Sequence, residues 1–139
     1  METENNSSWV AQFKASSDYL TLKEKPIAYF SAEYALSPLL PTYAGGLGIL
    51  AGDIVKEASA SQLPIVFVGL FYKKGQNDIV INSDIKNSGV ELITNNSVPV
   101  TISIPISNRH VFFQVWLWNE NGASVYLLDT DVPQNSLED

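Results

Sequence analysis

The run Gly45-Gly46-Leu47-Gly48 is the stretch of this sequence most suited to chemistry. A segment with a helical pattern, residues 49–61, follows it directly. Glycines let the backbone approach a ligand closely, and no Ser, Thr, Asp or Asn stands where it could cap the first N–H groups of the helix. Uncapped N–H groups at the positive end of a helix favour an anion, typically a phosphate. The run predicts a phosphate-binding loop, or else a tight turn in which the glycines serve packing alone.

Glu33 is a second candidate for a chemical role. It follows residues 27–31, a short apolar segment typical of a buried parallel strand. Open α/β sheets bind their ligands at the carboxyl ends of the strands. In such a site Glu33 would be a polar wall rather than a general acid, because no second carboxylate stands nearby at a useful spacing. The alternative is an exposed loop carboxylate.

Two other features have both a structural and a functional interpretation. His110 is the only histidine, and with no cysteine in the chain it cannot form an ordinary zinc site. Phe112, Trp116 and Trp118 share one face of a predicted strand and could form a stacking platform for sugar rings. Aromatic residues in such strands are more often core residues. We expect structural roles for all four residues.

The elements around the glycine run form a strand, a helix and a second strand. Uniformly apolar strands at residues 27–31 and 65–71, separated by a helix, indicate a Rossmann-like βαβ core with parallel strands in an α/β fold. Apolar residues recur after the glycine run with the period of a helix. They predict a buried stripe of Leu47, Leu50, Ala51, Ile54, Val55 and Ala58.

The second half of the chain predicts an added antiparallel β-meander. Weak strands are expected at residues 79–81 and 90–93. Residues 98–106 alternate apolar and polar side chains, which indicates a half-buried strand near a sheet edge, because Pro105 has no N–H to donate. Asn121-Gly122 predicts a two-residue hairpin. With that loop, Trp118 faces Val125 and Trp116 faces Leu127.

Bulk properties indicate one globular domain. The 139 residues are 45% hydrophobic and 11% aromatic, which is enough for a core. The net charge of −7 disfavours nucleic acids and anionic membranes as partners. The absence of cysteine and the acidic, polar N-terminus, which does not have the pattern of a signal peptide, favour a cytoplasmic protein. Residues 1–6 are expected to be disordered, and one helix is expected from residue 7 or 8 to about residue 20.

Several blocks of the sequence, in the same order, resemble the N-terminal part of the α-glucan phosphorylases, which act on glycogen, starch or maltodextrin. These blocks are residues 27–33 (IAYFSAE), 40–53 (LPTYAGGLGILAGD) and 63–72 (LPIVFVGLFY). Residues 125–131 (VYLLDTD) resemble a later stretch of the shorter bacterial and archaeal members. The resemblance fades between residues 76 and 122.

The resemblance implies a two-lobed glycosyltransferase that cleaves a terminal α-1,4 bond of a glucan with inorganic phosphate and releases glucose 1-phosphate. It implies pyridoxal phosphate as the cofactor, held by a lysine of the C-terminal lobe, for which no matching stretch is found here. In that scheme Gly45, Gly46, Leu47 and Gly48 bind phosphate and sugar through backbone N–H groups, and Glu33 lines the sugar pocket. The related glycogen and starch synthases carry a lysine where Tyr43 stands, which favours a phosphorylase.

We therefore expect residues 1–139 to form a single domain, the N-terminal fragment of a glucan phosphorylase. Residues 27–75 are its expected βαβ core, and residues 98–128 its antiparallel strands. The isolated chain is expected to be inactive, because the cofactor lobe is missing, and a homo-oligomer remains open. The alternatives are a stand-alone sugar- or phosphate-binding module, a subunit that completes a separately encoded catalytic half, and the N-domain of a synthase-like glycosyltransferase.

Overall fold

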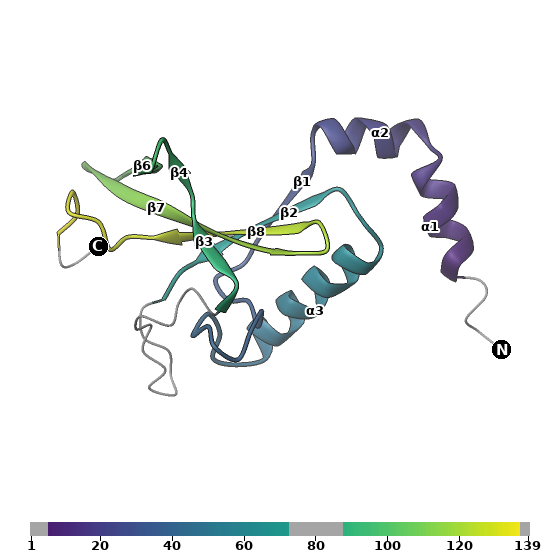
Figure 1. Ribbon diagram of the computed structural model, residues 1–139, viewed down its shortest axis with the longest axis horizontal. Helices are drawn as coiled ribbons and strands as arrows, with labels where there is room; N and C mark the ends of the chain where they lie inside the picture. Colours follow the sequence, from purple (N-terminus) through teal and green to yellow (C-terminus); the bar gives the residue numbers. More distant parts are fainter. Residues whose placement is uncertain (1–5, 73–87, 137–139) are drawn as a thin grey trace.

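The computed structural model describes residues 6–72 and 88–136 (Figure 1). Two short helices, α1 (Asn6–Lys14) and α2 (Ser17–Glu24), precede the strand β1 (Ile27–Phe30). The helix α3 (Gly46–Ala60) then connects β1 to β2 (Ile65–Leu70). The second half is built of β3 (Val90–Leu92), β4 (Thr94–Asn95), β5 (Val98–Pro99), β6 (Thr101–Ile106), β7 (Arg109–Glu120) and β8 (Ala123–Asp129). The strand expected at residues 79–81 lies outside the described residues, as do residues 73–75 of the expected core.

One mixed sheet organises the molecule. Its strand order is β1-β2-β8-β7-β3, with β6 also paired to β7, while β4 and β5 form a separate hairpin. The strands β1, β2 and β8 are parallel to one another, and β7 is antiparallel to β8, β6 and β3. The predicted α/β class and the parallel pairing of β1 with β2 across a helix are confirmed. The predicted meander, β6-β7-β8, is continuous with the parallel strands, because β8 pairs directly with β2.

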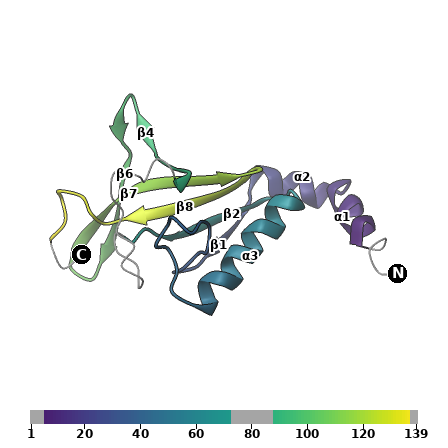
Figure 2. The same ribbon diagram turned by 60° about the horizontal axis from the view of Figure 1, so that its bottom comes forward.

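The helix α3 lies along one face of the sheet (Figures 1 and 2). Its residues Ala51, Val55 and Ala58 are buried against the sheet core. The sheet side of that core includes Phe67 of β2, Trp118 of β7, and Val125 and Leu127 of β8. The segment that leads from β1 to α3 adds Tyr34 and Leu40, which are both buried.

The buried stripe of α3 differs from the predicted one. Leu47 and Leu50 are 55% and 60% exposed, and the buried residues are Gly48, Ala51, Gly52, Val55, Ala58 and Ser59. The helix is therefore rotated so that its small side chains face the protein. A Cβ atom on Gly52 would lie 2.5 Å from the carbonyl oxygen of Ala35, so the helix backbone approaches this segment too closely for larger residues.

The N-terminal region also departs from the sequence prediction. Two helices replace the single one expected, because the Ser16 hydroxyl accepts a hydrogen bond from the Tyr19 N–H (3.3 Å) and caps a new helix there. Residue 6 is helical, whereas residues 1–5, also expected to be disordered, lie outside the described part. Figures 1 and 2 show α1 and α2 projecting beyond the end of the sheet, and α2 has no buried residue.

Two strands are more exposed than predicted. The strand β1 was expected to be buried, but it lies at the edge of the sheet and three of its four residues are exposed. All six residues of β6 are exposed rather than alternately buried. The hairpin at Asn121-Gly122 is confirmed: both residues have positive φ, and the predicted pairs of Trp118 with Val125 and Trp116 with Leu127 are present.

The helices of the described segments are all too short or too polar to cross a lipid bilayer.

Candidate functional site

The glycine run lies at the start of α3, beside Glu33. Gly45 is the N-cap residue, and no side chain of the described segments caps the helix there. The Oε2 atom of Glu33 accepts hydrogen bonds from the backbone N–H groups of Ala44 (3.2 Å) and Gly45 (3.4 Å). The structure thus brings the two predicted features together at the carboxyl end of β1. It also places a protein carboxylate directly before the first helical N–H groups, where the sequence predicts an exogenous anion.

The glycines of the run have two different environments. A Cβ atom on Gly45 or Gly46 would meet no heavy atom of the described chain within 4 Å. On Gly48 it would clash with the Cβ atom of Tyr43 and lie 3.1 Å from Oε2 of Glu33. Gly48 is therefore required for packing, whereas Gly45 and Gly46 leave open space in front of the helix. The interpretation that the glycines serve packing therefore holds for Gly48. For Gly45 and Gly46 the structure shows no packing requirement, and ligand binding stays a prediction.

Backbone hydrogen bonds fix the segment between β1 and the glycine run. The Tyr34 N–H donates to the Thr42 carbonyl (2.9 Å), and the buried Thr42 hydroxyl donates to the Tyr34 carbonyl (2.6 Å). The Ala35 N–H donates to the Gly48 carbonyl (2.9 Å). This segment is thus pinned to itself and to α3, so Glu33 has a defined position relative to the helix.

Two tyrosines connect this segment to the sheet. The Tyr34 hydroxyl donates to the Tyr29 carbonyl at 2.9 Å, and its ring packs against Gly69, where an added Cβ atom would lie 2.7 Å from Cε2. Burial raises the pKa of the Tyr34 hydroxyl to about 12. The Tyr72 hydroxyl donates to the Ala32 carbonyl (3.2 Å), and burial, followed by the negative charge of Glu33, raises its pKa. Tyr72 therefore follows β2 next to Glu33, at the same sheet edge.

Asp129 is a buried carboxylate that sequence reasoning did not single out. It ends β8, the third parallel strand, and is 5% exposed. Its Oδ2 atom accepts hydrogen bonds from Gln114 Nε2 (2.7 Å) and Trp116 Nε1 (3.0 Å), and its Oδ1 atom accepts one from the Asp131 N–H (2.9 Å). These neutral donors compensate the buried charge. Asp129 consequently organises the carboxyl end of β8 rather than presenting a free carboxylate.

The tryptophans contribute to the core. Trp118 is buried within it, and the Trp116 ring stacks on Phe71 with centroids 5.1 Å apart. Because the Trp116 indole also donates to Asp129, neither ring is presented as a platform for sugars. His110 is exposed on β7, and the described residues contain no cluster of three or more potential metal ligands.

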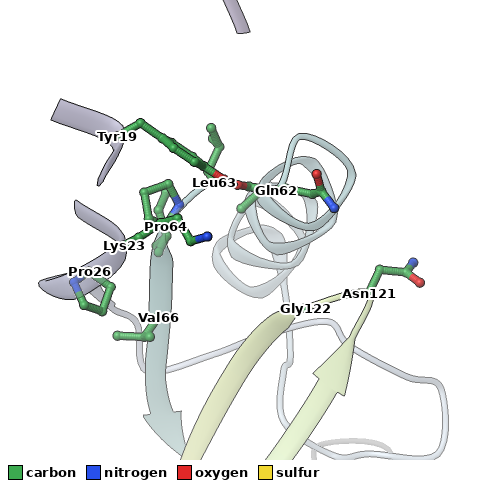
Figure 3. A pocket seen from close by; sticks show the side chains of 11 residues that line it. Tyr19, Lys23, Pro26, Gln62, Leu63, Pro64, Val66, Asn121 and Gly122 are labelled. Atoms are coloured by element: carbon green, nitrogen blue, oxygen red, sulfur yellow. Dashed lines mark hydrogen bonds between the residues drawn. The ribbon is translucent and has the colours of Figure 1, made fainter. Parts of the chain in front are cut away.

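A separate pocket of about 310 Å³ lies at the opposite end of the parallel strands (Figure 3). Tyr19 and Lys23 of α2 line it together with Gln62, Pro64 and Asn121. The Tyr19 hydroxyl donates to the Gln62 carbonyl (3.1 Å), so this region attaches α2 to the end of α3. Because α/β sheets bind ligands at the carboxyl ends of their strands, the glycine run is the stronger candidate.

Comparison with known proteins identifies the relatives of this chain. The maltodextrin phosphorylase of Thermococcus litoralis is 41% identical over 128 residues, which cover 84% of this chain and 15% of the relative. The glycogen phosphorylases of Mycobacterium tuberculosis and Aquifex aeolicus are 34% and 33% identical, over 78% and 86% of this chain. The chain is homologous to a small part of the glycogen and maltodextrin phosphorylases. The resemblance noted in the sequence is thereby confirmed.

The homology covers most of this chain but little of its relatives. The chain spans 14% of the Mycobacterium tuberculosis protein and 19% of the Aquifex aeolicus protein. No protein-family model matches the sequence. A protein of Methanocaldococcus jannaschii described only as uncharacterized is 32% identical over 80% of the chain.

Proposed function

We propose that this chain is the N-terminal part of an α-1,4-glucan phosphorylase, and that its glycine run is one wall of the site for phosphate and sugar. The observation that carries the proposal is the 41% identity to a maltodextrin phosphorylase over 84% of the chain. In this proposal the Rossmann-like unit of β1, α3 and β2 belongs to the first of two lobes. The whole enzyme works in the cytoplasm on a glucan and inorganic phosphate, or on glucose 1-phosphate in the reverse direction.

The geometry of the glycine run supports a role in binding. The backbone N–H groups of Gly46, Leu47 and Gly48 belong to the first turn of α3, where a helix has no internal acceptors. Gly45 and Gly46 have no side chain to obstruct access to these N–H groups, and an added Cβ atom at either residue would meet no heavy atom of the described chain within 4 Å. A phosphate or a sugar hydroxyl fits this combination of donors and open space.

The charge of Glu33 limits what the chain can bind by itself. A carboxylate and a phosphate about 5 Å apart repel by roughly 3 kcal/mol at an effective dielectric constant of about 20. A helix N-terminus contributes at most about 2 kcal/mol in return. Tight phosphate binding therefore requires cationic groups from another part of the enzyme, whereas a neutral sugar hydroxyl can donate to Glu33 directly. For the isolated chain we expect at best millimolar affinity for glucose 1-phosphate, about −4 kcal/mol.

The described residues do not fit a pyridoxal phosphate site. Their lysines are Lys14, Lys23, Lys25 and Lys56, on or directly after the helices, and none is at the carboxyl ends of the parallel strands. Lys56 pairs with Asp53 on the surface of α3, and Lys14 donates to Gln62. In the proposed enzyme the cofactor is held by the other lobe, and the isolated chain has no phosphorolytic activity.

Titrations followed by backbone amide chemical shifts test the site. Glucose 1-phosphate is expected to shift the amides of Gly46, Leu47 and Gly48. Gly46→Val should abolish these shifts by filling the open space. Ala60→Val, at the exposed far end of the same helix, should leave them unchanged. Far-UV circular dichroism checks that both variants are folded.

Two outcomes would contradict the proposal. If other amides shift while those of the glycine run do not, the run is only a turn. If the isolated chain releases glucose 1-phosphate from maltodextrin and phosphate, it is a complete catalyst and the fragment interpretation is wrong.

A further inference from the structure

The face of the sheet opposite α3 is largely apolar and is open over β1, β2 and the end of β8. The strand registers place Ala28, Phe30, Val66, Val68, Leu70, Tyr126 and Leu128 on this side, and we call these seven residues the open face. Ser124 also lies on this side, and next to Leu128 the face continues onto β7 with Val115, which is buried. Side chains of alternate residues point to opposite faces of a sheet. Their neighbours Phe67, Val125 and Leu127 therefore point toward α3 and form the core.

The open face exposes large side chains. Phe30 is 72% exposed and Leu70 is 40% exposed. Together with Val68 and Leu128 they line a hollow of about 310 Å³ at the carboxyl ends of the three parallel strands. None of the seven residues is charged. Burial of Phe and Leu side chains removes a large apolar surface from water, so covering this hollow would stabilise the protein.

Within the described residues, the topology explains why no helix covers this face. Parallel strands are joined by crossovers, usually helices, that leave parallel sheets buried on both sides. The crossover from β1 to β2 is α3, which occupies one face. The described part of the connection from β2 to β8, residues 88–122, contains only strands, turns and a single helical residue. Figure 2 shows α3 on one side of β1, β2 and β8, with α1 and α2 beyond the end of the sheet.

We propose that the open face is the docking surface for a helical layer supplied by the part of a phosphorylase polypeptide that lies outside the matched section. That part is large, because the chain covers only 14–19% of its named relatives. An uncharged, apolar surface over parallel strands fits the apolar side of amphipathic helices. The proposal rests on the homology and not on ligand binding at the glycine run.

Two other occupants fit the surface less well. The chain has a net charge of −7, and the open face has no lysine or arginine with which to bind an anionic membrane or a nucleic acid. Two copies of the chain docked through this face would bring together two molecules that each have a net charge of −7. Such a dimer would also cover the hollow with a second sheet and not with a helical layer.

The test uses the maltodextrin phosphorylase of Thermococcus litoralis with the section that matches this chain deleted. This deletion protein is co-expressed with the 139-residue chain and purified through a tag on the chain. A one-to-one complex in sedimentation velocity is the expected result. Phe30→Asp and Leu70→Asp should each weaken the complex at least tenfold. Leu20→Asp, on α2 at a residue 63% exposed, is the matched control and should change the affinity less than twofold.

Each of the other outcomes either supports or overturns the proposed docking surface. A deletion protein that is soluble only with the wild-type chain, and not with the folded Phe30→Asp variant, supports the proposal. The absence of any complex, or equal binding by the Asp variants, overturns it. So does a homodimer of the chain, or its binding to phosphatidylcholine vesicles, if Phe30→Asp abolishes it, because the occupant is then a second copy or a lipid surface. None of these measurements depends on phosphate or sugar binding, so failure here is separate from failure of the glycine-run site.

Discussion

Oε2 of Glu33 lies 3.2 Å from the backbone nitrogen of Ala44 and accepts its hydrogen bond. The same atom accepts the N–H of Gly45, so the carboxylate fixes the two residues that precede α3. A negative charge at this position also favours the helix dipole. The N–H groups left for a ligand are those of the first helical turn, Gly46 to Gly48. Glu33 therefore both builds the candidate site and restricts the ligands that it accepts.

The two kinds of glycine in the run should respond oppositely to substitution. Gly48→Ala forces a methyl group against Tyr43 and Glu33, and we expect it to lower the free energy of unfolding by about 1–3 kcal/mol. Gly46→Ala meets open space within a helix and should be neutral or stabilising by about 0.4–1 kcal/mol, because alanine restricts the unfolded chain. Urea unfolding followed by circular dichroism measures both. Equal effects of the two substitutions would show that Gly48 is not closely packed.

The rotated stripe of α3 predicts which apolar residues matter for stability. Val55→Ala removes methyl groups from a fully buried side chain and should cost about 2 kcal/mol. Leu50→Ala, although a larger truncation, acts at a residue 60% exposed and should stay within about 0.5 kcal/mol. Thermal unfolding of the two variants distinguishes the stripes. A greater loss for Leu50→Ala would mean that the predicted stripe, and not the observed one, faces the core.

The Tyr34 hydroxyl should make stability fall at alkaline pH. Its pKa is about 12 in the folded chain and about 10 in the unfolded chain, so between these values only the unfolded state loses the proton. This contribution is fully present below pH 10 and is lost as the pH rises to 12, by on the order of 2–3 kcal/mol.

The matched variant for this effect is Tyr34→Phe. At pH 8 it should be less stable than the wild type by about 1 kcal/mol, because the hydrogen bond to the Tyr29 carbonyl is lost. From about pH 10 the difference should shrink, and by about pH 11 it should reverse. Urea unfolding at pH 8, 10 and 11.5 provides the test, and a difference independent of pH would mean that the hydroxyl is not desolvated.

Asp129→Asn should disrupt the end of β8. All the groups bonded to this side chain are donors, and an asparagine amide would turn its own N–H groups toward at least one of them. We expect a loss of about 1–3 kcal/mol, because at least one buried donor loses its acceptor, and a change in the fluorescence of Trp116, whose indole donates to this side chain. Asp53→Asn removes only an exposed ion pair on α3 and should cost less than about 1 kcal/mol. If both changes cost the same, the donors around Asp129 do not stabilise it.

Local chemistry explains what could be predicted from the sequence. Asn121-Gly122 specifies a tight hairpin because both residues tolerate positive φ, and the register of β7 with β8 follows from that loop length alone. The same register places Gln114 opposite Asp129, so the buried carboxylate could have been found as the acidic end of an otherwise apolar strand. The position of Glu33 at the carboxyl end of β1 likewise follows from the order of the elements.

Long-range packing explains which features could not be predicted from the sequence. In α3, both the predicted stripe of larger apolar residues and the observed stripe of small residues fit the helical period. The stripe of small residues is buried because the helix backbone at Gly48 and Gly52 contacts the segment after β1. The path of that segment, with its hydrogen bonds between Tyr34 and Thr42, has no repeating pattern in sequence. For that reason the bond between Glu33 and Ala44 could not be anticipated, even though both residues lie in the recognised blocks.

The central place of β8 has a consequence for how the chain folds. This strand comes at residues 123–129, yet it sits between β2 and β7 and joins the two halves of the sheet. During synthesis, β1, α3 and β2 leave the ribosome well before β8 has been made. Residues that pair between β2 and β8, such as Val66 and Ser124, are distant in sequence. Contacts of this kind form slowly, and until they form, Phe67 and Leu70 are without their partner strand. Premature termination before residue 123 would leave two halves with no strand to connect them.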